Sequence, residues 1–110
     1  MTTDKTGAPT TVTAESDRFR IAVDGQTVGF AEFADRNGQR IFLHTEVADD
    51  FEGRGLATIL VNEALQATRD AGLRIVAVCP MVAAYIGKHH EFDDVVDPVD
   101  RDIKRWLKNS

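Results

Sequence analysis

The stretch with the clearest chemical potential is a pair of glycines that flanks an arginine, Gly53, Arg54 and Gly55, directly before a segment of helical periodicity. The first N–H groups of an α-helix have no intrahelical partners, and the helix dipole places partial positive charge there. Glycines ahead of such a terminus let the backbone approach an anion closely, because no Cβ intervenes. By spacing alone, a phosphate cradle and a flexible entry to a helix are equally good interpretations.

Two side chains that can move protons lie just before this stretch, in a run with strand-like alternation. His44 and Glu46 are two residues apart, so in a strand they share one face, opposite Leu43, Thr45 and Val47. A histidine or a carboxylate in that position can take a proton from a reacting group. The alternative is a polar pair on a solvated face.

Two further reactive side chains lie after the stretch. Cys79 is the single cysteine and follows an apolar run, which makes it either a nucleophile near a helix N-terminus or a small buried side chain. Tyr85 is the single tyrosine, in a segment with helical spacing, where an aromatic ring commonly packs at the rim of the core. Lys88 follows it, where a cation suits a helix C-terminus.

The elements that must position these residues read as a mixed α/β arrangement. Three strand-like runs, at 18–23, 26–33 and 40–47, are separated by Asp-Gly and Asn-Gly turn signals and predict an antiparallel meander. Apolar residues at helical spacing then predict a helix over 55–71 that Gly72 ends. A β-branched run at 74–79 predicts a buried strand parallel to the third one, because a crossover helix precedes it. A short helix over 81–90, a short strand and loop, and a C-terminal helix complete the order.

Length and composition predict one domain and set limits on its partners. The chain has 110 residues, of which 1–15 are predicted to be a flexible N-terminal tail, with an edge strand as the alternative, and 16–110 to be the single domain. A net charge of −5 argues against nucleic-acid and anionic-membrane partners. The lone cysteine and the polar N-terminus suggest a cytoplasmic protein. No ligand cluster with metal-binding spacing is present, so no metal is expected.

The segment Glu52 to Ala57, "EGRGLA", resembles the acyl-CoA signature Gln/Arg-x-x-Gly-x-Gly/Ala of the GNAT acetyltransferase superfamily. Gly55 and Ala57 match the small positions, whereas Glu52 departs from the Gln/Arg position. The later segment "GLRIVAVCPMVAAYIGKHHEFDDVV" is similar to the short single-domain GNAT-like family called the YjdJ type, and the likeness runs from about Arg18 to Val96.

The resemblance implies a compact GNAT-like α/β fold and acetyl-CoA as the cosubstrate. It implies transfer of an acetyl group to an amine, either a small molecule or a protein lysine. A noncatalytic CoA-binding module that acts through a partner is the alternative. A monomer or weak homodimer is expected. The residues that the resemblance assigns to cofactor binding are Val47, Glu52, Gly53, Arg54, Gly55, Leu56, Ala57, Thr58 and Lys88. Those assigned to catalysis are Cys79 as acyl carrier, Tyr85 as acid to the departing thiolate, and His44 or Glu46 as base.

Overall fold

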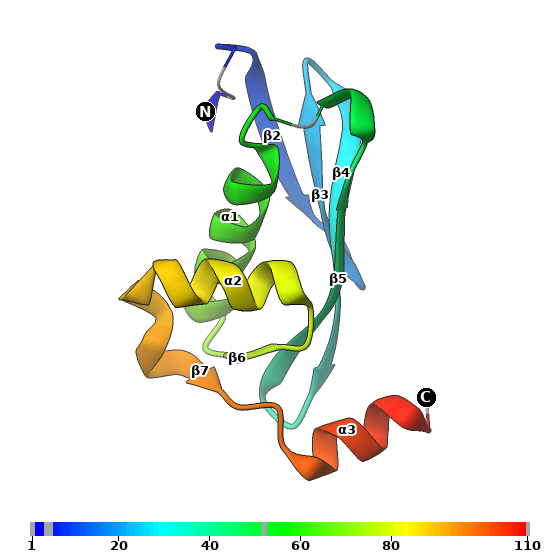
Figure 1. The fold of residues 1–110 in the computed structure, drawn as a ribbon, viewed down its shortest axis with the longest axis vertical. Helices are drawn as coiled ribbons and strands as arrows, with labels where there is room; N and C mark the ends of the chain where they lie inside the picture. Colours follow the sequence, from blue (N-terminus) through cyan, green and yellow to red (C-terminus); the bar gives the residue numbers. More distant parts are fainter. Residues whose placement is uncertain (1, 4–5, 52, 110) are drawn as a thin grey trace.

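The computed structural model describes residues 2–3, 6–51 and 53–109, and the chain forms one mixed sheet with helices on both faces (Figure 1). The strands run in chain order across the sheet: β1 (Thr2–Thr3), β2 (Pro9–Ala14), β3 (Arg18–Val23), β4 (Gln26–Arg36), β5 (Gln39–Val47), β6 (Arg74–Ala77) and β7 (Val96–Asp97). The helices are η1 (Asp49–Phe51), α1 (Leu56–Asp70), α2 (Pro80–Lys88), η2 (His90–Val95) and α3 (Arg101–Lys108).

The connections decide which strands are antiparallel. β2 to β5 follow one another through short turns, and β1 to β5 pair antiparallel. The helical crossovers bring β6 parallel to β5 and β7 parallel to β6. The tight turns use positive φ at Asp24 and Gly25 and at Asn37 and Gly38, as the turn signals predict. The predicted meander, crossover helix and parallel strand are therefore confirmed.

The N-terminal region differs from the expected tail over 1–15. Pro9–Ala14 forms β2, which pairs with β3 from Thr10 opposite Val23 to Ala14 opposite Phe19. Thr10 is buried, and Val12 packs against the core beside α1. The alternative to the tail, a strand, is therefore the one found for Pro9–Ala14. Threonine and valine are β-branched and favour strands, but alternate threonines carry little apolar signal, which is why a tail was preferred.

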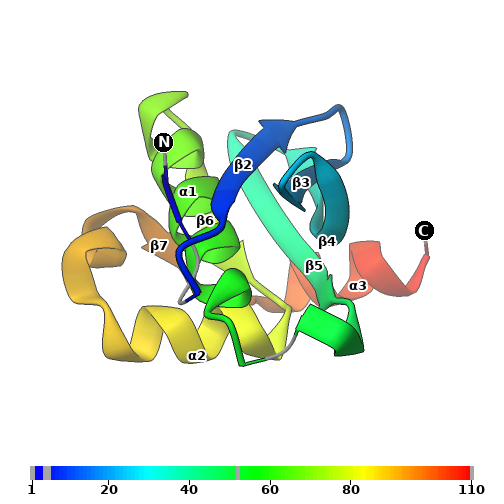
Figure 2. The ribbon, with the colours of Figure 1, turned by 90° about the horizontal axis from the view of Figure 1, so that it is seen from above.

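Two hydrophobic clusters lie on opposite faces of the sheet. The larger one fills the space beneath α1 and α2, and its bulkiest members include Phe19, Phe42, Leu60 and Phe92. The smaller one packs Ile103 of α3 against the other face. Figure 2 shows α3 on the opposite side of the sheet from α1. β6 contributes to both, since Ile75 belongs to the larger cluster and Val76 to the smaller one. This is the two-sided burial expected of that strand, although it ends at Ala77 instead of Cys79.

A bulge in β5 changes which side chains face the helices. Glu32 of β4 lies opposite His44, but the next residue, Phe33, lies opposite Phe42, so Leu43 is an extra residue. Phe42 and Thr45 therefore both point toward the helices, while Leu43 packs in the smaller cluster. Simple alternation predicts that Leu43 and Thr45 share one face of the strand, and that detail of the prediction is wrong.

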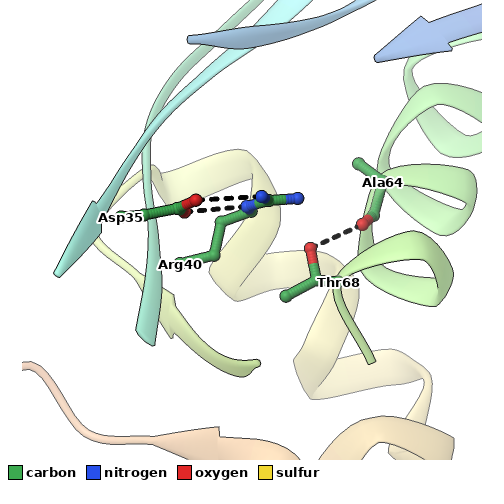
Figure 3. A network of polar contacts seen from close by, with 4 residues as sticks. All are labelled: Asp35, Arg40, Ala64 and Thr68. Carbon is green, nitrogen blue, oxygen red and sulfur yellow. Dashed lines mark hydrogen bonds and ion pairs between the residues drawn. The ribbon is translucent and has the colours of Figure 1, made fainter. Parts of the chain in front are cut away.

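Arg40 closes the end of the larger cluster that lies away from the glycine stretch. Its guanidinium makes two hydrogen bonds to Asp35, of 2.8 and 2.9 Å, and lies over the Phe33 ring at 4.1 Å (Figure 3). Across from it in α1, the Thr68 hydroxyl donates to the Ala64 carbonyl at 2.8 Å. Arg40, Asp35 and Thr68 are thus all hydrogen-bonded within the protein at this end.

Candidate functional site

A large open cavity lies at the C-terminal end of β5, beyond the part of β5 that pairs with β6. Phe42 of β5 pairs with Ala77, and its carbonyl accepts hydrogen bonds from Val78 and Cys79 as the chain turns into α2. In the described part of the chain, no strand pairs with residues 43–47 on the side away from β4. The cavity has a volume of about 980 Å³ and is bounded by the start of β4, the end of β5, the glycine stretch and α2. A cavity of this size accommodates an extended organic ligand.

The glycine stretch forms one wall of this cavity and has the geometry of an anion cradle. Gly53 and Gly55 have φ of 79° and 77°, a conformation that glycine adopts without strain. Gly55 is the N-cap of α1 and supplies no side-chain cap, and the first helical turn has no acidic residue. The amides of Leu56, Ala57 and Thr58 therefore begin the helix without intrahelical acceptors, at the cavity wall.

Two residues of the opposite wall were not predicted as site residues. A Cβ on Gly29 would lie 2.6 Å from the Glu46 carbonyl oxygen, so only glycine allows β4 and β5 to approach this closely. Thr45 is buried, yet it also lines the cavity. A glycine inside a strand pattern often marks such a close approach, which is the signal that the sequence offered for Gly29.

His44 and Glu46 contact each other on the face of the sheet opposite α1. His44 Nε2 and Glu46 Oε1 are 3.0 Å apart, and the side chains are 54% and 62% exposed. The His44 ring lies 6.1 Å from that of Phe30. Glu46 lines the cavity together with Val47, whereas His44 does not. The predicted shared face is confirmed, and Glu46 is the member of the pair beside the cavity.

Cys79 lies behind the cavity wall. It is 3% exposed, belongs to the larger hydrophobic cluster and precedes α2 as its N-cap. Its thiol donates a hydrogen bond to Thr45 Oγ1, at 3.4 Å. Thr45 lines the cavity, whereas Cys79 does not. The structure thus places the predicted nucleophile next to the site, with Thr45 between the sulfur and the cavity. Its role as acyl carrier stays a prediction.

Tyr85 and Lys88 line a second, smaller cavity between α1 and α2. The Tyr85 hydroxyl donates to Asn62 Oδ1 at 2.9 Å, and its ring stacks on His89 at 4.2 Å. Burial raises the pKa of Tyr85, and the charge of Glu91 raises it further, so the phenol keeps its proton at neutral pH. Asn62 and His89 had not been predicted to take part in a site.

Arg54 and Glu52 are the remaining residues that were predicted to belong to the site. Arg54 Nη2 donates to Thr6 Oγ1 at 3.1 Å and the guanidinium lies over the Phe51 ring at 5.0 Å, so the N-terminal segment contacts the glycine stretch. Glu52, where the sequence departs from the acyl-CoA signature, lies outside the described residues. Within the described ranges, no group of three or more His, Cys, Asp or Glu side chains is placed to hold a metal ion.

None of the described helices combines the length and the apolar character needed to span a membrane.

Comparison with known proteins gives results of two kinds. A family model described as GCN5-related N-acetyl-transferase matches residues 18–95. A solution structure from Staphylococcus aureus, described provisionally as a GCN5-like N-acetyltransferase, superimposes with a TM-score of 0.63 at 19% identity, over 83% of this chain and 91% of that one. No protein with curated annotation matches the chain significantly. At that identity the structural likeness concerns the fold, whereas the family match covers most of the chain.

Proposed function

Because the chain belongs to the GCN5-related N-acetyltransferase family, we propose that it binds acetyl-CoA in the large cavity and transfers the acetyl group to an amine. The observation that carries this proposal is the position of the glycine stretch, which lies at the edge of the large cavity beside the unpaired end of β5. The uncapped amides of Leu56, Ala57 and Thr58 suit the pyrophosphate of CoA.

The unpaired edge of β5 suits the rest of the cosubstrate. The pantetheine arm of CoA carries two amide groups in an extended chain. Residues 43–47 have no strand on the side away from β4 in the described structure, so their backbone groups can pair with those amides as a neighbouring strand would. Such pairing would bring the thioester along β5 toward Thr45 and Glu46.

The reaction then needs a proton acceptor beside the thioester. The amine nitrogen attacks the thioester carbonyl, the C–S bond breaks, and the CoA thiolate leaves while the nitrogen gives up a proton. Glu46 lines the cavity, and His44 Nε2 lies 3.0 Å from its carboxylate, so we assign Glu46 as the group that receives that proton. Carboxylates at this wall, Glu46 and Asp49, also favour a cationic acceptor.

Titration calorimetry with acetyl-CoA tests the binding half of the proposal, and two glycine variants sharpen it. Gly55 and Gly72 have nearly the same φ, 77° and 76°, at opposite ends of α1. Alanine at either position costs about 1–2 kcal/mol of conformational strain. Only Gly55 lines the cavity, so Gly55→Ala should weaken acetyl-CoA binding while Gly72→Ala leaves it unchanged. Equal affinities in both variants, or no binding by the wild type, would contradict the proposal.

Release of the CoA thiol with a panel of amines tests the catalytic half. Glu46→Gln should lower turnover and change its pH dependence with little effect on acetyl-CoA affinity. Binding without thiol release for any amine would instead favour a noncatalytic CoA-binding module.

A further inference from the structure

The C-terminal helix α3 lies beyond the part of the chain that the family model matches, which ends at residue 95. It carries four cations and one carboxylate, a net charge of +3, whereas the whole chain has −5 and the residues outside α3 therefore have −8. The cations stand at positions i, i+3, i+4 and i+7, and all four are exposed: Arg101, Lys104, Arg105 and Lys108. This spacing gathers them within about 100° of the helix circumference. We call this set the basic stripe.

The packing of α3 gives no reason for the basic stripe. None of its four side chains forms an ion pair with another described residue. The packed side of α3 is the opposite one, where Ile103 is buried in the smaller cluster and Trp106 and Leu107 pack beside it. Like charges at these spacings repel one another, and a cation in the first turn, such as Arg101, also opposes the helix dipole. The stripe therefore suits a partner that carries negative charge.

The rim of the large cavity carries the complementary charge. Glu46 and Asp49 line the cavity, and Asp50, the next residue of η1, is exposed. None of the described residues that line this cavity is a lysine, an arginine or a histidine. Phe30 pairs with Glu46 across β4 and β5 and also lines the cavity, so its ring offers an apolar surface to the methylene chain of a lysine. A lysine in a basic setting therefore fits the rim where acetyl transfer is proposed.

The basic stripe and the cavity of one molecule lie at opposite ends. Figure 1 shows α3 at the lower end of the longest axis and η1 with the start of α1 at the upper end, in a molecule 41 Å long. Ile103 belongs to the same cluster as Ile41 of β5, and Ile41 precedes Glu46 by five residues, about 17 Å along a strand. The stripe also faces away from the sheet. Its lysines can therefore enter only the cavity of a second copy.

We propose that Lys104 and Lys108 accept acetyl groups in the cavity of a second copy of this chain. This inference rests on the proposed acetyl transfer and names its acceptor as a lysine of a basic helix. The neutral ε-nitrogen attacks the thioester carbonyl of acetyl-CoA, so that an N–C bond forms and the C–S bond breaks. Glu46 receives the proton that the nitrogen gives up, and the departing CoA thiolate takes a proton from solvent. Arg101 and Arg105 keep their charge and steer the stripe to the acidic rim.

A mixture of two variants tests whether the transfer occurs between copies. The acceptor is Glu46→Gln/Gly55→Ala, which lacks the proposed base and a glycine of the cavity wall. The donor is Lys104→Arg/Lys108→Arg, which keeps the charge of the stripe but has no amine there to acetylate. With isotope-labelled acetyl-CoA, peptide mass spectrometry should find label on α3 of the acceptor only when the donor is present. The donor alone should release CoA thiol with small amines at the wild-type rate.

Two controls separate this transfer from chemical acetylation and test the role of charge. Lys88 is also exposed, at the end of α2, and reports the chemical background in the same molecules. Raising the salt concentration from about 0.05 M to about 0.5 M should slow acetylation of α3 by about 10-fold, with a much smaller effect on turnover with a small monoamine. An acceptor that also carries Arg101→Gln/Arg105→Gln should be labelled about 10-fold more slowly at low salt. Equal labelling rates for the two acceptors would contradict docking through the stripe.

The outcomes separate this inference from the proposed function. If small amines cause thiol release while α3 stays unlabelled, the inference fails and the proposed function stands. Equal labelling of α3 with and without the donor would show chemical acetylation and would also overturn the inference. Labelling of the wild type by itself, without transfer in the mixture, would show a reaction within one molecule and refute the second copy. If the wild type binds no acetyl-CoA, both proposals fail.

Discussion

Gly29→Ala perturbs the close approach of β4 and β5 that forms one wall of the large cavity. A Cβ at Gly29 would lie 2.6 Å from the backbone carbonyl oxygen of Glu46 and 3.2 Å from methyl groups of Ile21 and Val47. A carbon atom approaches a carbonyl oxygen to about 3.3 Å at closest. The two strands must therefore separate by several tenths of an ångström, and a backbone carbonyl in a sheet cannot rotate away as a side chain can.

The expected cost follows from two opposing terms. Overpacking of this kind costs about 1–3 kcal/mol, while replacing a glycine in a strand restores about 0.5–1 kcal/mol of backbone entropy. The middle of each range gives a net loss of about 1.3 kcal/mol. For 110 residues the unfolding entropy is about 0.23 kcal/mol/K, so Tm should fall by about 5–6 °C.

Thermal unfolding followed by circular dichroism measures this loss. Gly87→Ala is the matched control, since Gly87 lies in α2 and a Cβ there meets nothing within 4 Å. That variant should unfold at a temperature about 2–4 °C higher than the wild type, because alanine is the better helix residue. If Gly29→Ala were as stable as the wild type, β4 and β5 would not be in the close contact described, and the wall of the cavity would have a different shape.

Three further perturbations test other parts of the structure. The hydrogen bond from Gln39 and the ion pair with Arg74 hold the pKa of Asp97 below its usual value. The stability that the ionised carboxylate contributes is therefore complete above about pH 4, and it is lost as the pH falls through the lower pKa of the folded state. Asp97→Asn should therefore reduce stability at pH 7 by about 0.5–1 kcal/mol in urea unfolding, with a smaller difference from the wild type in acid; an equal difference at all pH values would contradict it. Arg40→Ala should cost about 1–3 kcal/mol through lost stacking and an unpaired carboxylate, and Arg40→Lys should recover only part; unchanged urea midpoints would refute the role given to the guanidinium. Cys79→Ala should keep turnover, because the thiol is buried and 3% exposed; an acetyl adduct on the wild type together with loss of turnover in the variant would instead establish the covalent route.

The order of elements was predictable because each has a local signal. The hairpin turns carry Asp-Gly and Asn-Gly, α1 carries an apolar stripe that ends at Gly72, and the strand after it is apolar on both faces. The glycine stretch was recognised for the same reason, since its residues are adjacent in the chain. For β2, a strand was only the alternative to a flexible tail, because its inward positions are threonine and valine among other threonines. The burial that makes it a strand comes from α1.

Contacts between distant segments could not be predicted in this way. The bulge at Leu43 arises from the pairing of two strands, and it decides that Thr45 faces the helices while Glu46 borders the cavity from the other side. Two further contacts depend on how α2 packs on the sheet and on α1. One is the hydrogen bond between Cys79 and Thr45, and the other is the stacking of Tyr85 on His89 together with the hydrogen bond from Tyr85 to Asn62.

By itself, the sequence determined the succession of strands and helices and the position of the glycine stretch at the α1 N-terminus, because turn geometry, hydrophobic periodicity and helix polarity are local properties. Only the tertiary structure decided which side chains meet at the two cavities. The gap beside β5 exists because β6 pairs with only four of its residues before the chain turns into α2, and that limit is set by packing among segments far apart in the chain.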